Sequence, residues 1–368
     1  MRVSVVRPGE LGPVELKTWR EMQHSTPSLG NPFLSPDFTV AMGHVSAGAR
    51  VAVITESDGP VGFFPFERRG GGVGAALGGW VSLCQGVIHR PGAEFDAGAL
   101  LRACGLSVWE FGCMVEGQRW FRPFETLRQQ AVVLDFAGGY PAFLAGLRER
   151  SPKFVKSTLY KERKLSRDVG EVTSEFAVRD PEQLRLLRGW KSAQYRRMGR
   201  PDRFARSWVV ELVERLHAAD TPDFAGPLSM LYADGRPVAG HFGLRTDTTM
   251  IGWFPAYDPE YARYSPGLIQ HLRMVEAAAG IGVRSLDLGI SNGSEYKDAL
   301  CTRTVPVSEG TVRRRSVAAT AHWLRTEPVR RARRLVLDTP ALYGVADRAM
   351  KRYGRLRGDG GRMSGEAG

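Results

Sequence analysis

The residues with the clearest chemical potential follow a short apolar strand, in the segment Asp287–Leu300, DLGISNGSEYKDAL. A polar Gly/Ser/Asn loop leads from this strand to Tyr296 and Lys297, which begin a helical turn. Loops at the carboxyl ends of strands are where α/β proteins place ligands. A tyrosine can give a proton to a leaving thiolate, and a lysine can hold a phosphate or carboxylate. The alternative is that Tyr296 packs on the core and Lys297 is a surface lysine.

A second candidate is the junction Tyr257–Leu268, YDPEYARYSPGL, which joins the apolar strand Thr249–Pro255 to a helix. Ser265 is suited to cap this helix, Pro266 suits its first position, and Gly267 leaves the backbone amides uncovered. Unpaired amides and the helix dipole make such a helix start an anion site. The same Ser-Pro-Gly pattern is also an ordinary helix start, so this motif alone does not decide the function.

A third candidate is His241, in the strand sequence VAGHFGL. A histidine beside small residues can act as the general base that deprotonates an amine or hydroxyl acceptor. The alternative is a structural histidine with satisfied hydrogen bonds.

The fourth motif is Trp190–Tyr195, WKSAQY, followed by two arginines. Aromatic residues interleaved with basic ones suit stacking and phosphate contact. They equally suit an amphipathic helix with Trp190 buried, which is the interpretation we prefer.

Several common catalytic motifs are missing from the sequence. It contains no GxSxG, HExxH, Walker loop or GxGxxG after a strand, so serine hydrolase, zinc protease and P-loop NTPase functions lack support. The four cysteines lie far apart without a CxxC pair, so we expect neither a zinc site nor a disulfide framework. We expect no metal.

An internal repeat indicates how these candidates are positioned. Val51–Glu67 and Leu228–Thr246 each consist of two apolar runs around an Asp-Gly pair, which predicts a β-hairpin. Each hairpin is followed by a short apolar helix and a strand, in Gly98–Gly112 and Met274–Gly289. Two hairpin–helix–strand units at matching distances predict a duplicated α/β fold.

The stretch between the two units is predicted to be largely helical. We expect a Gly-rich loop at 70–79, a helix over 140–168 ended by Val169-Gly170, a strand over 171–178, a helix from Pro181 capped by Asp180, and a helix over about 203–219. The last 55 or so residues are predicted to form basic helices around Trp323–Leu337, with a disordered Gly-rich end.

Charge and hydropathy indicate which partners and which cellular location to expect for the protein. The net charge is +12, and the segment 313–368 alone carries fourteen basic residues against five acidic ones. Basic stretches also occur at 148–167 and 185–206, and such surfaces attract nucleic acid, anionic lipid or phosphate groups, although a solvated Arg-rich face is the plain alternative. With no secretory signal and no uninterrupted apolar stretch of about 18 residues, we expect a cytoplasmic protein, at most peripheral to the inner membrane surface.

Seven residue strings in order resemble the BioF2-like acetyltransferase family, whose members include CelD-type proteins linked to cellulose or exopolysaccharide synthesis. The strings are NPFLSPDF (31–38), GFFPFERR (62–69), RKLSRDVGEV (163–172), WKSAQYRRMG (190–199), LSMLYADGRPVAGHFGLR (228–245), WFPAYDPEYARYSPGL (253–268), and LDLG with YKDAL near residue 290. The resemblance covers roughly residues 32–310.

This resemblance implies an α/β fold of two tandem GNAT-like domains, each a mixed, mostly antiparallel sheet flanked by helices. We expect a degenerate domain over 1–139 that shapes the acceptor site, an acyltransferase domain over 140–312, and a basic helical tail over 313–368. The architecture is similar to that of Fem-type transferases, which use aminoacyl-tRNA.

The resemblance also assigns roles to residues. The phosphate-binding loop would comprise Arg263, Tyr264, Ser265, Pro266, Gly267 and Leu268, a shortened form of the RxxGxG/A loop. Backbone amides of Thr249–Pro255, where Phe254 lies, would polarise the acyl carbonyl. Asp287, Tyr296 and Lys297 would close the site, and His241 or a bound water would take the acceptor's proton.

The expected activity is transfer of an acyl group, acetyl in the simplest case, from acyl-CoA to an amine or hydroxyl of a small-molecule or glycan acceptor. Two alternatives stay open. The basic stretches favour aminoacyl-tRNA as the donor. The Arg-rich tail, with Trp323 and Leu324, favours a non-catalytic scaffold of a polysaccharide synthase on an anionic membrane.

Overall fold

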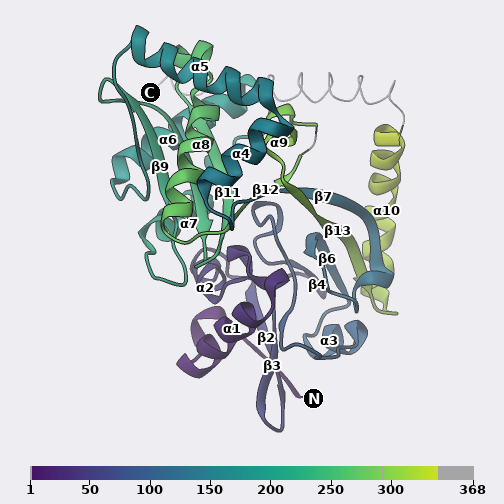
Figure 1. Cartoon of the computed structure of the whole chain (residues 1–368). Coiled ribbons are helices and arrows are strands. Elements are labelled where there is room, and N and C mark those ends of the chain that lie inside the picture. Colours follow the sequence, from purple (N-terminus) through teal and green to yellow (C-terminus); the bar gives the residue numbers. More distant parts are fainter. Residues whose placement is uncertain (1, 292, 339–368) are drawn as a thin grey trace, which may run out of the picture.

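A computed structural model describes residues 2–291 and 293–338 of the 368-residue chain (Figure 1). The first half contains β1 (Arg2–Val6), α1 (Pro13–Ser25), α2 (Pro36–Val45), β2 (Ala49–Glu56), β3 (Gly59–Arg69), β4 (Val73–Ala76), β5 (Ile88–His89), α3 (Ala97–Ala103), β6 (Val108–Val115) and β7 (Glu125–Asp135). The second half contains α4 (Tyr140–Arg150), α5 (Pro152–Asp168), β8 (Val172–Glu175), α6 (Pro181–Arg197), α7 (Ser207–Ala218), β9 (Leu228–Ala233), β10 (Arg236–Arg245), β11 (Thr249–Tyr257), α8 (Pro266–Gly280), β12 (Ser285–Ile290), α9 (Glu295–Leu300), β13 (Arg303–Arg313) and α10 (Val317–Asp338).

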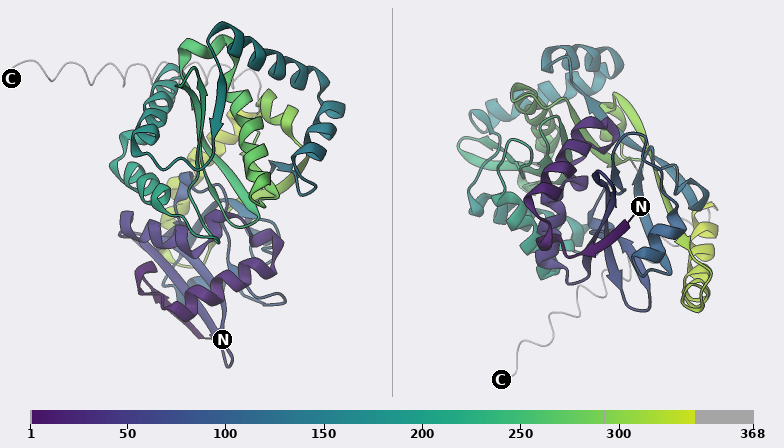
Figure 2. Two further views of the ribbon diagram at one scale, coloured as in Figure 1. Left: turned by 60° about the vertical axis from the view of Figure 1, so that its left-hand side comes forward. Right: turned by 90° about the horizontal axis from the view of Figure 1, so that it is seen from below.

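All described strands belong to one 13-stranded mixed sheet with the order β1-β2-β3-β4-β6-β13-β7-β12-β11-β10-β9-β8, and β5 pairs with β3. The neighbouring strands are antiparallel except for two parallel pairs, β4 with β6 and β11 with β12. Each parallel pair lies in a different half of the sheet. In the left view of Figure 2, the lobe that contains the second half lies above the lobe that contains the first half.

Two strands join the halves. β7 pairs through Val133 with Asp287 of β12 and also runs beside β13 over most of its length. β13 in turn pairs with β6, where Val307 lies opposite Val115. The last described strand therefore completes the sheet of the first half, although it follows the second half in sequence. The expected domain boundary between residues 139 and 140 stays a prediction.

The predicted internal repeat is present. The second hairpin turns at the expected Asp-Gly pair, where Asp234 and Gly235 adopt the left-handed φ values of 52° and 71° that a tight hairpin turn requires. The first hairpin turns one residue earlier than expected, at Ser57-Asp58, because Gly59 already pairs with Glu56. The helix and strand that follow each hairpin are α3 with β6 and α8 with β12. The duplicated mixed α/β fold expected from the sequence is confirmed.

The second half-sheet is covered by helices on both faces. Leu184 of α6 and Leu212 of α7 pack with Phe242 and Ile251 on one face. On the other face, side chains of α4, α5 and α8 pack with Met250, Leu286 and Leu288. Successive apolar side chains of β10, β11 and β12 therefore point to opposite faces of the sheet and are buried in two separate cores.

Two local predictions need correction. The Gly-rich segment 70–79 is not wholly a loop, because it contains β4, where a Cβ on Gly74 would lie 2.7 Å from the Leu106 side chain. The predicted helix over 140–168 is two helices, α4 and α5, because Pro152 begins a new helix after Ser151.

The expected basic helix around residues 323–337 is part of α10, which extends from Val317 to Asp338. The Gly-rich end predicted to be disordered falls within 339–368, outside the described residues. No helix within 2–291 and 293–338 combines the length and apolar character needed to cross a lipid bilayer.

Candidate functional site

The site is built where β11 and β12 separate. The two strands pair in parallel only from Thr249 with Ser285 to Ile251 with Asp287. Beyond this point β12 continues beside β7, where Ile290 lies opposite Ala131. The carboxyl-terminal part of β11 therefore has β10 on one edge and no strand on the other.

A β-bulge on β11 strengthens this separation. Gly252 pairs with Gly243 and Phe254 pairs with Phe242, so Trp253 has no partner on β10. A bulge bends its strand and redirects its backbone groups. On the edge that faces away from β10, the main chain of β11 beyond Ile251 thus has no strand partner, as polarisation of an acyl carbonyl would require.

α8 begins beside this opening, directly after the short helix η7 (Pro259–Tyr264). Pro266 occupies its first position, as predicted. The expected capping by the Ser265 side chain is wrong: Ser265 adopts a left-handed conformation with φ 51°, and its hydroxyl accepts a hydrogen bond of 2.8 Å from Lys161 Nζ. The first amides of α8 lack a side-chain cap, and a cation lies next to them, which are two properties of an anion site.

Two buried histidines lie behind this helix start. His241 on β10 and His271 on α8 have ring centroids 5.0 Å apart. His271 Nδ1 lies 2.6 Å from the Gly267 carbonyl, whereas His271 Nε2 and both ring nitrogens of His241 have no hydrogen-bond partner. His241 is therefore not the satisfied structural histidine that we considered. Burial lowers the pKa of both imidazoles, that of His241 well below its ordinary value, and the proximity of His271 contributes to the effect on His241.

Tyr296 and Lys297 extend the cluster from α9. The Tyr296 ring lies 5.4 Å from the His271 ring, and burial raises the pKa of its phenol, so the hydroxyl stays protonated near neutral pH. Lys297 Nζ donates hydrogen bonds to the carbonyls of Leu288 at 2.5 Å and Ile290 at 2.9 Å. Lys297 thereby fixes the end of β12, and burial lowers the pKa of its amine.

Asp287 lies at the last position of β12 that pairs with β11. Its carboxylate accepts hydrogen bonds from the Gly289 amide at 2.7 Å and from Asn31 Nδ2 at 3.2 Å. Burial raises its pKa to about 6, and the Gly289 amide opposes that shift. Because Asn31 belongs to the first half, this contact places both halves at the site. Leu83, also from the first half, lies against Gly289, where a Cβ would be 3.6 Å from its side chain.

Two residues of the cluster were missed as candidates by sequence reasoning. His271 follows Gly267 by one helical turn on an otherwise apolar helix face, and that isolated polar position is a signal we did not use. Lys191 lies in the WKSAQY motif that we assigned to ordinary packing. Its Nζ donates to the Pro255 carbonyl of β11 at 2.8 Å, and burial together with nearby cations lowers its pKa to about 8.

Four assigned residues lie away from the histidines. Tyr264 is buried and donates a hydrogen bond to Asp168 at 3.1 Å, and the exposed Arg263 guanidinium covers the Tyr264 ring. Phe254 packs in the core between Trp253 and Phe204, and Leu268 is half-buried at the start of α8. Their roles in donor binding stay predictions.

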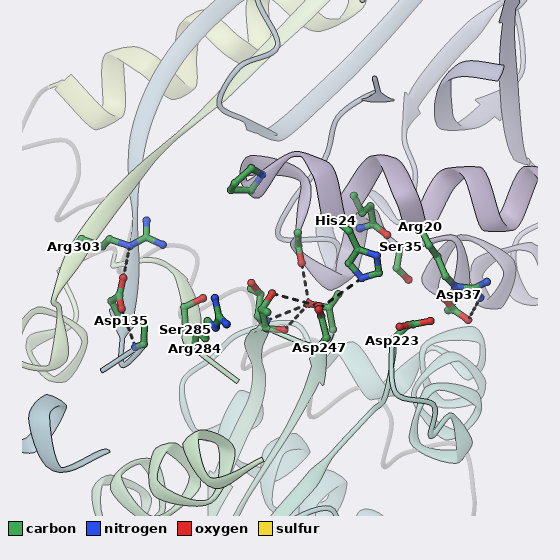
Figure 3. A pocket seen from close by; sticks show the side chains of 17 residues that line it. Arg20, His24, Ser35, Asp37, Asp135, Asp223, Asp247, Arg284, Ser285 and Arg303 are labelled. Carbon is green, nitrogen blue, oxygen red and sulfur yellow. Dashed lines mark hydrogen bonds and ion pairs between the residues drawn. The ribbon is translucent and has the colours of Figure 1, made fainter. Parts of the chain in front are cut away.

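A polar cavity of about 580 Å³ lies at the opposite ends of the same strands, next to Thr249 and Ser285. Figure 3 shows three pairs among its side chains: Arg20 with Asp37 at 3.0 Å, His24 with Asp247 at 3.8 Å, and Arg303 with Asp135 at 3.4 Å. His24 and Asp247 come from different halves. Because three side-chain pairs line it and one of them joins the two halves, we regard the cavity as part of the contact between the halves and not as the reaction site.

Comparison with known proteins agrees with this geometry. The family model described as "Acetyltransferase (GNAT) domain" matches residues 153–298, which include α8, β12 and most of α9. Among curated proteins, none matches the chain in sequence. Within the parts of the chain that the structure describes, no group of three or more His, Cys, Asp or Glu residues could hold a metal ion.

Three solved structures share the fold across most of the chain. FemX has a TM-score of 0.60 at 10% identity, covering 84% of this chain and 96% of its own. A conserved protein of unknown function from Bacteroides thetaiotaomicron has a TM-score of 0.55 at 11% identity, covering 83% and 98%. The C-terminal domain of a lysylphosphatidylglycerol synthetase from Agrobacterium fabrum has 0.51 at 13% identity, covering 85% and 95%.

Residues 153–298 thus match a GNAT acetyltransferase domain, and the sheet that surrounds them has the architecture of the solved structures above. This match identifies the chain as an acyltransferase.

Proposed function

We propose that this protein transfers an acyl group, acetyl in the simplest case, from acyl-CoA directly to an amine or hydroxyl acceptor. The observation that carries the proposal is the meeting of three features at one opening of the sheet. These are the uncapped start of α8, the unpartnered imidazole of His241 and the protonated phenol of Tyr296. Acyl transfer needs a group of each kind: an anion site, a base and an acid.

The donor's phosphates would bind at the start of α8, where Lys161 adds a positive charge beside Ser265. The thioester carbonyl would accept hydrogen bonds from the unpaired main-chain amides of β11. Bound acyl-CoA supplies an activated thioester, so the chain itself needs no covalent intermediate. Holding donor and acceptor in line can remove roughly 7–11 kcal/mol of the barrier.

Proton transfers then complete the reaction. A bond forms between the acceptor nitrogen or oxygen and the acyl carbon, while the bond from that carbon to sulfur breaks. His241, directly or through a water, takes the proton that the acceptor loses, and Tyr296 gives a proton to the departing thiolate. Lys297, the residue after Tyr296, donates hydrogen bonds to the end of β12 and thereby fixes the position of α9, the helix that carries Tyr296.

The acceptor would approach from the side of the first half. Asn31 and Leu83 reach β12 from that half, which supports a role for it in shaping the acceptor site. The resemblance to BioF2-like and CelD-type proteins favours a glycan or another cell-envelope acceptor, handled in the cytoplasm or at the inner membrane surface.

A second candidate donor is aminoacyl-tRNA, and α5 is the observation that favours it. This helix carries six basic residues, and one of them, Lys161, contacts the start of α8. The fold is shared with FemX, and Fem-type transferases use aminoacyl-tRNA. Binding of tRNA should weaken steeply between low and physiological salt, because phosphate contacts dominate it. Binding independent of salt would exclude this donor.

A third candidate, a membrane-surface scaffold, rests on α10. Trp323 and Leu324 are 41% and 61% exposed on this basic helix, whereas the side chains of Leu335, Val336 and Leu337 lie outside the described ones. Flotation with anionic liposomes, with and without the residues after Gly310, tests this function. If the full chain stays at the bottom of the gradient, the scaffold function is excluded.

Calorimetric titration with acetyl-CoA and desulfo-CoA tests the main proposal. The Gly267→Trp variant places a large side chain at the start of α8 and should abolish binding. Gly280→Trp changes the other end of the same helix, where a Cβ meets no atom within 4 Å, and should bind like wild type. Absence of binding by the wild type would reject acyl-CoA as the donor.

A further inference from the structure

An exposed tryptophan lies between two arginines where the halves meet. Trp80, in the loop after β4, is 43% exposed. The guanidinium carbons of Arg203 and Arg206 lie 5.0 and 5.6 Å from its ring centroid, and the Trp208 ring meets it edge-on at 5.7 Å. We refer to these four residues as the Trp80 cluster. Large aromatic side chains with arginines on the surface are characteristic of binding sites.

The two guanidiniums of the cluster carry charge that the protein leaves uncompensated. Within 2–291 and 293–338, neither Arg203 nor Arg206 forms an ion pair with a carboxylate, although many other arginines do. Asp202, next to Arg203, instead bonds Arg196 and Ser192. Two unpaired guanidiniums over one indole would attract an anionic group held close to a ring.

A hollow of about 450 Å³ adjoins the cluster. It is lined by Trp80, Arg206 and Trp208 on one side and by Glu67, Arg69 and Ser46 on the other. Ser46 Oγ bonds the Glu67 carboxylate at 2.9 Å, and Arg69 lies 3.6 Å from Glu110. Arg69 is thus paired with a carboxylate and Glu67 with a neutral hydroxyl, whereas the described residues give Arg206, beside Trp80, no carboxylate partner.

The cluster is connected to the reaction site by the short helix η6 (Arg203–Ala205). Phe204 packs on Phe254 of β11 with ring centroids 4.9 Å apart. The charge of Arg203 also reaches Lys191, which bonds the Pro255 carbonyl of β11. The helix that carries Arg203 is therefore packed on β11, the strand that borders the proposed reaction site.

We propose that the Trp80 cluster is the recognition site for an acceptor that carries a sugar ring with a phosphate or carboxylate group. The apolar face of the sugar would lie on the indole, and the anionic group would bind Arg203 and Arg206. The role of the bound sugar as an acceptor rests on the proposed acyl transfer, but binding of the sugar can be measured without any acyl donor.

The test is calorimetric or NMR titration of the full chain with glucose 6-phosphate, glucuronate, glucose and AMP. The two anionic sugars should bind, and glucose should bind at least about tenfold more weakly because it lacks the charge-assisted hydrogen bonds. Trp80→Ala and the double variant Arg203→Gln/Arg206→Gln should each weaken binding about tenfold, while Trp80→Phe, which keeps a ring, should restore most of it.

Trp323→Ala is the matched control, since Trp323 is similarly exposed but lies on α10, and it should bind the sugars like wild type. Unchanged binding by Trp80→Ala, equal binding of glucose and its phosphate, or no binding of any sugar would overturn the inference. AMP binding more tightly than both anionic sugars, in a Trp80-dependent way, would also overturn it in favour of a nucleotide. Acetyl-CoA affinity should be the same in all variants, so a failed acyl-CoA titration would reject the donor proposal without affecting this one.

Discussion

His241 and His271 come from a strand and a helix that pack on each other, and their ring centroids lie 5.0 Å apart without a carboxylate between them. Burial lowers the pKa of both imidazoles, and the nearby His271 lowers that of His241 further, because a second proton would place two like charges in a water-poor environment. The pair is therefore neutral near pH 7. Neutral imidazoles with unpartnered nitrogens are available to accept a proton, which is what acyl transfer demands of a base.

Replacing this base should reduce turnover selectively. We expect His241→Gln to lower kcat about 100-fold, the usual contribution of general base catalysis. Since the pKa of His241 lies well below 6.5, wild-type kcat should stay level from pH 8 down to pH 6 and fall only at more acidic pH. Steady-state rates across this range check the prediction. His44→Gln, an exposed histidine of α2, is the control. A wild-type profile with a midpoint near 6.5 would argue against His241 as the base.

Tyr296→Phe should separate chemistry from donor binding. Removal of the phenol leaves the thiolate without its proton donor, so kcat should fall about 100-fold while the Kd for acyl-CoA changes little. Burial raises the pKa of Tyr296, so wild-type activity should persist on the alkaline side until the phenol ionises above pH 10. Rates measured with donors of different thiol acidity provide the check. An equal loss for good and poor leaving groups would show that Tyr296 is not the acid.

Asp287 should make folding stability depend on pH. Its folded pKa of about 6 exceeds the model-compound value of 3.8, so the folded state binds the proton more tightly than the unfolded state. The free energy of unfolding should therefore decrease as pH rises from 4 to 6, by up to about 3 kcal/mol from this group. Denaturant titrations of wild type and Asp287→Asn at several pH values measure the difference. Parallel curves for the two proteins would contradict the shifted pKa.

Gly252 should tolerate no side chain. A Cβ there would lie 2.9 Å from His241 Nε2 and 3.0 Å from Leu288 Cδ2. We expect Gly252→Ala to lower the free energy of unfolding by about 1–3 kcal/mol and to reduce kcat, because His241 must move.

Gly189→Ala in α6 is the matched control for that substitution. A Cβ at Gly189 meets no atom within 4 Å, so this variant should gain about 0.5–1 kcal/mol in stability. If both glycines behaved alike in thermal unfolding, the packing of Gly252 on His241 would be refuted.

The elements could be predicted well because their signals are local. The Asp-Gly turn of the second hairpin, the apolar alternation of β9 and β10, and the Asp180 cap of α6 each depend on a few neighbouring residues. The prediction of a loop over the Gly-rich segment 70–79 was partly wrong. Gly74 lies in a strand, where close packing on Leu106 requires a glycine, and glycine content alone does not distinguish such a strand from a loop.

The site was only partly predictable, since its contacts join distant segments. Asn31 meets Asp287, Lys161 meets Ser265, and Lys191 meets Pro255, and no short spacing connects the members of these pairs. His271 is equally hidden, because its importance depends on facing His241 across a packed interface. Local capping rules also misled us at Ser265, whose hydroxyl is engaged by a lysine from another helix.

The position of β13 has a consequence for synthesis of the protein on the ribosome. Val307 must pair with Val115, so the β6 edge remains without its neighbour while the entire second half is translated. The first half cannot close its sheet as it emerges, and its hydrogen-bonding edge is exposed to misassociation until β13 has been synthesised. We therefore expect the nascent chain to depend on chaperones, and its two halves to fold and unfold as a single cooperative unit.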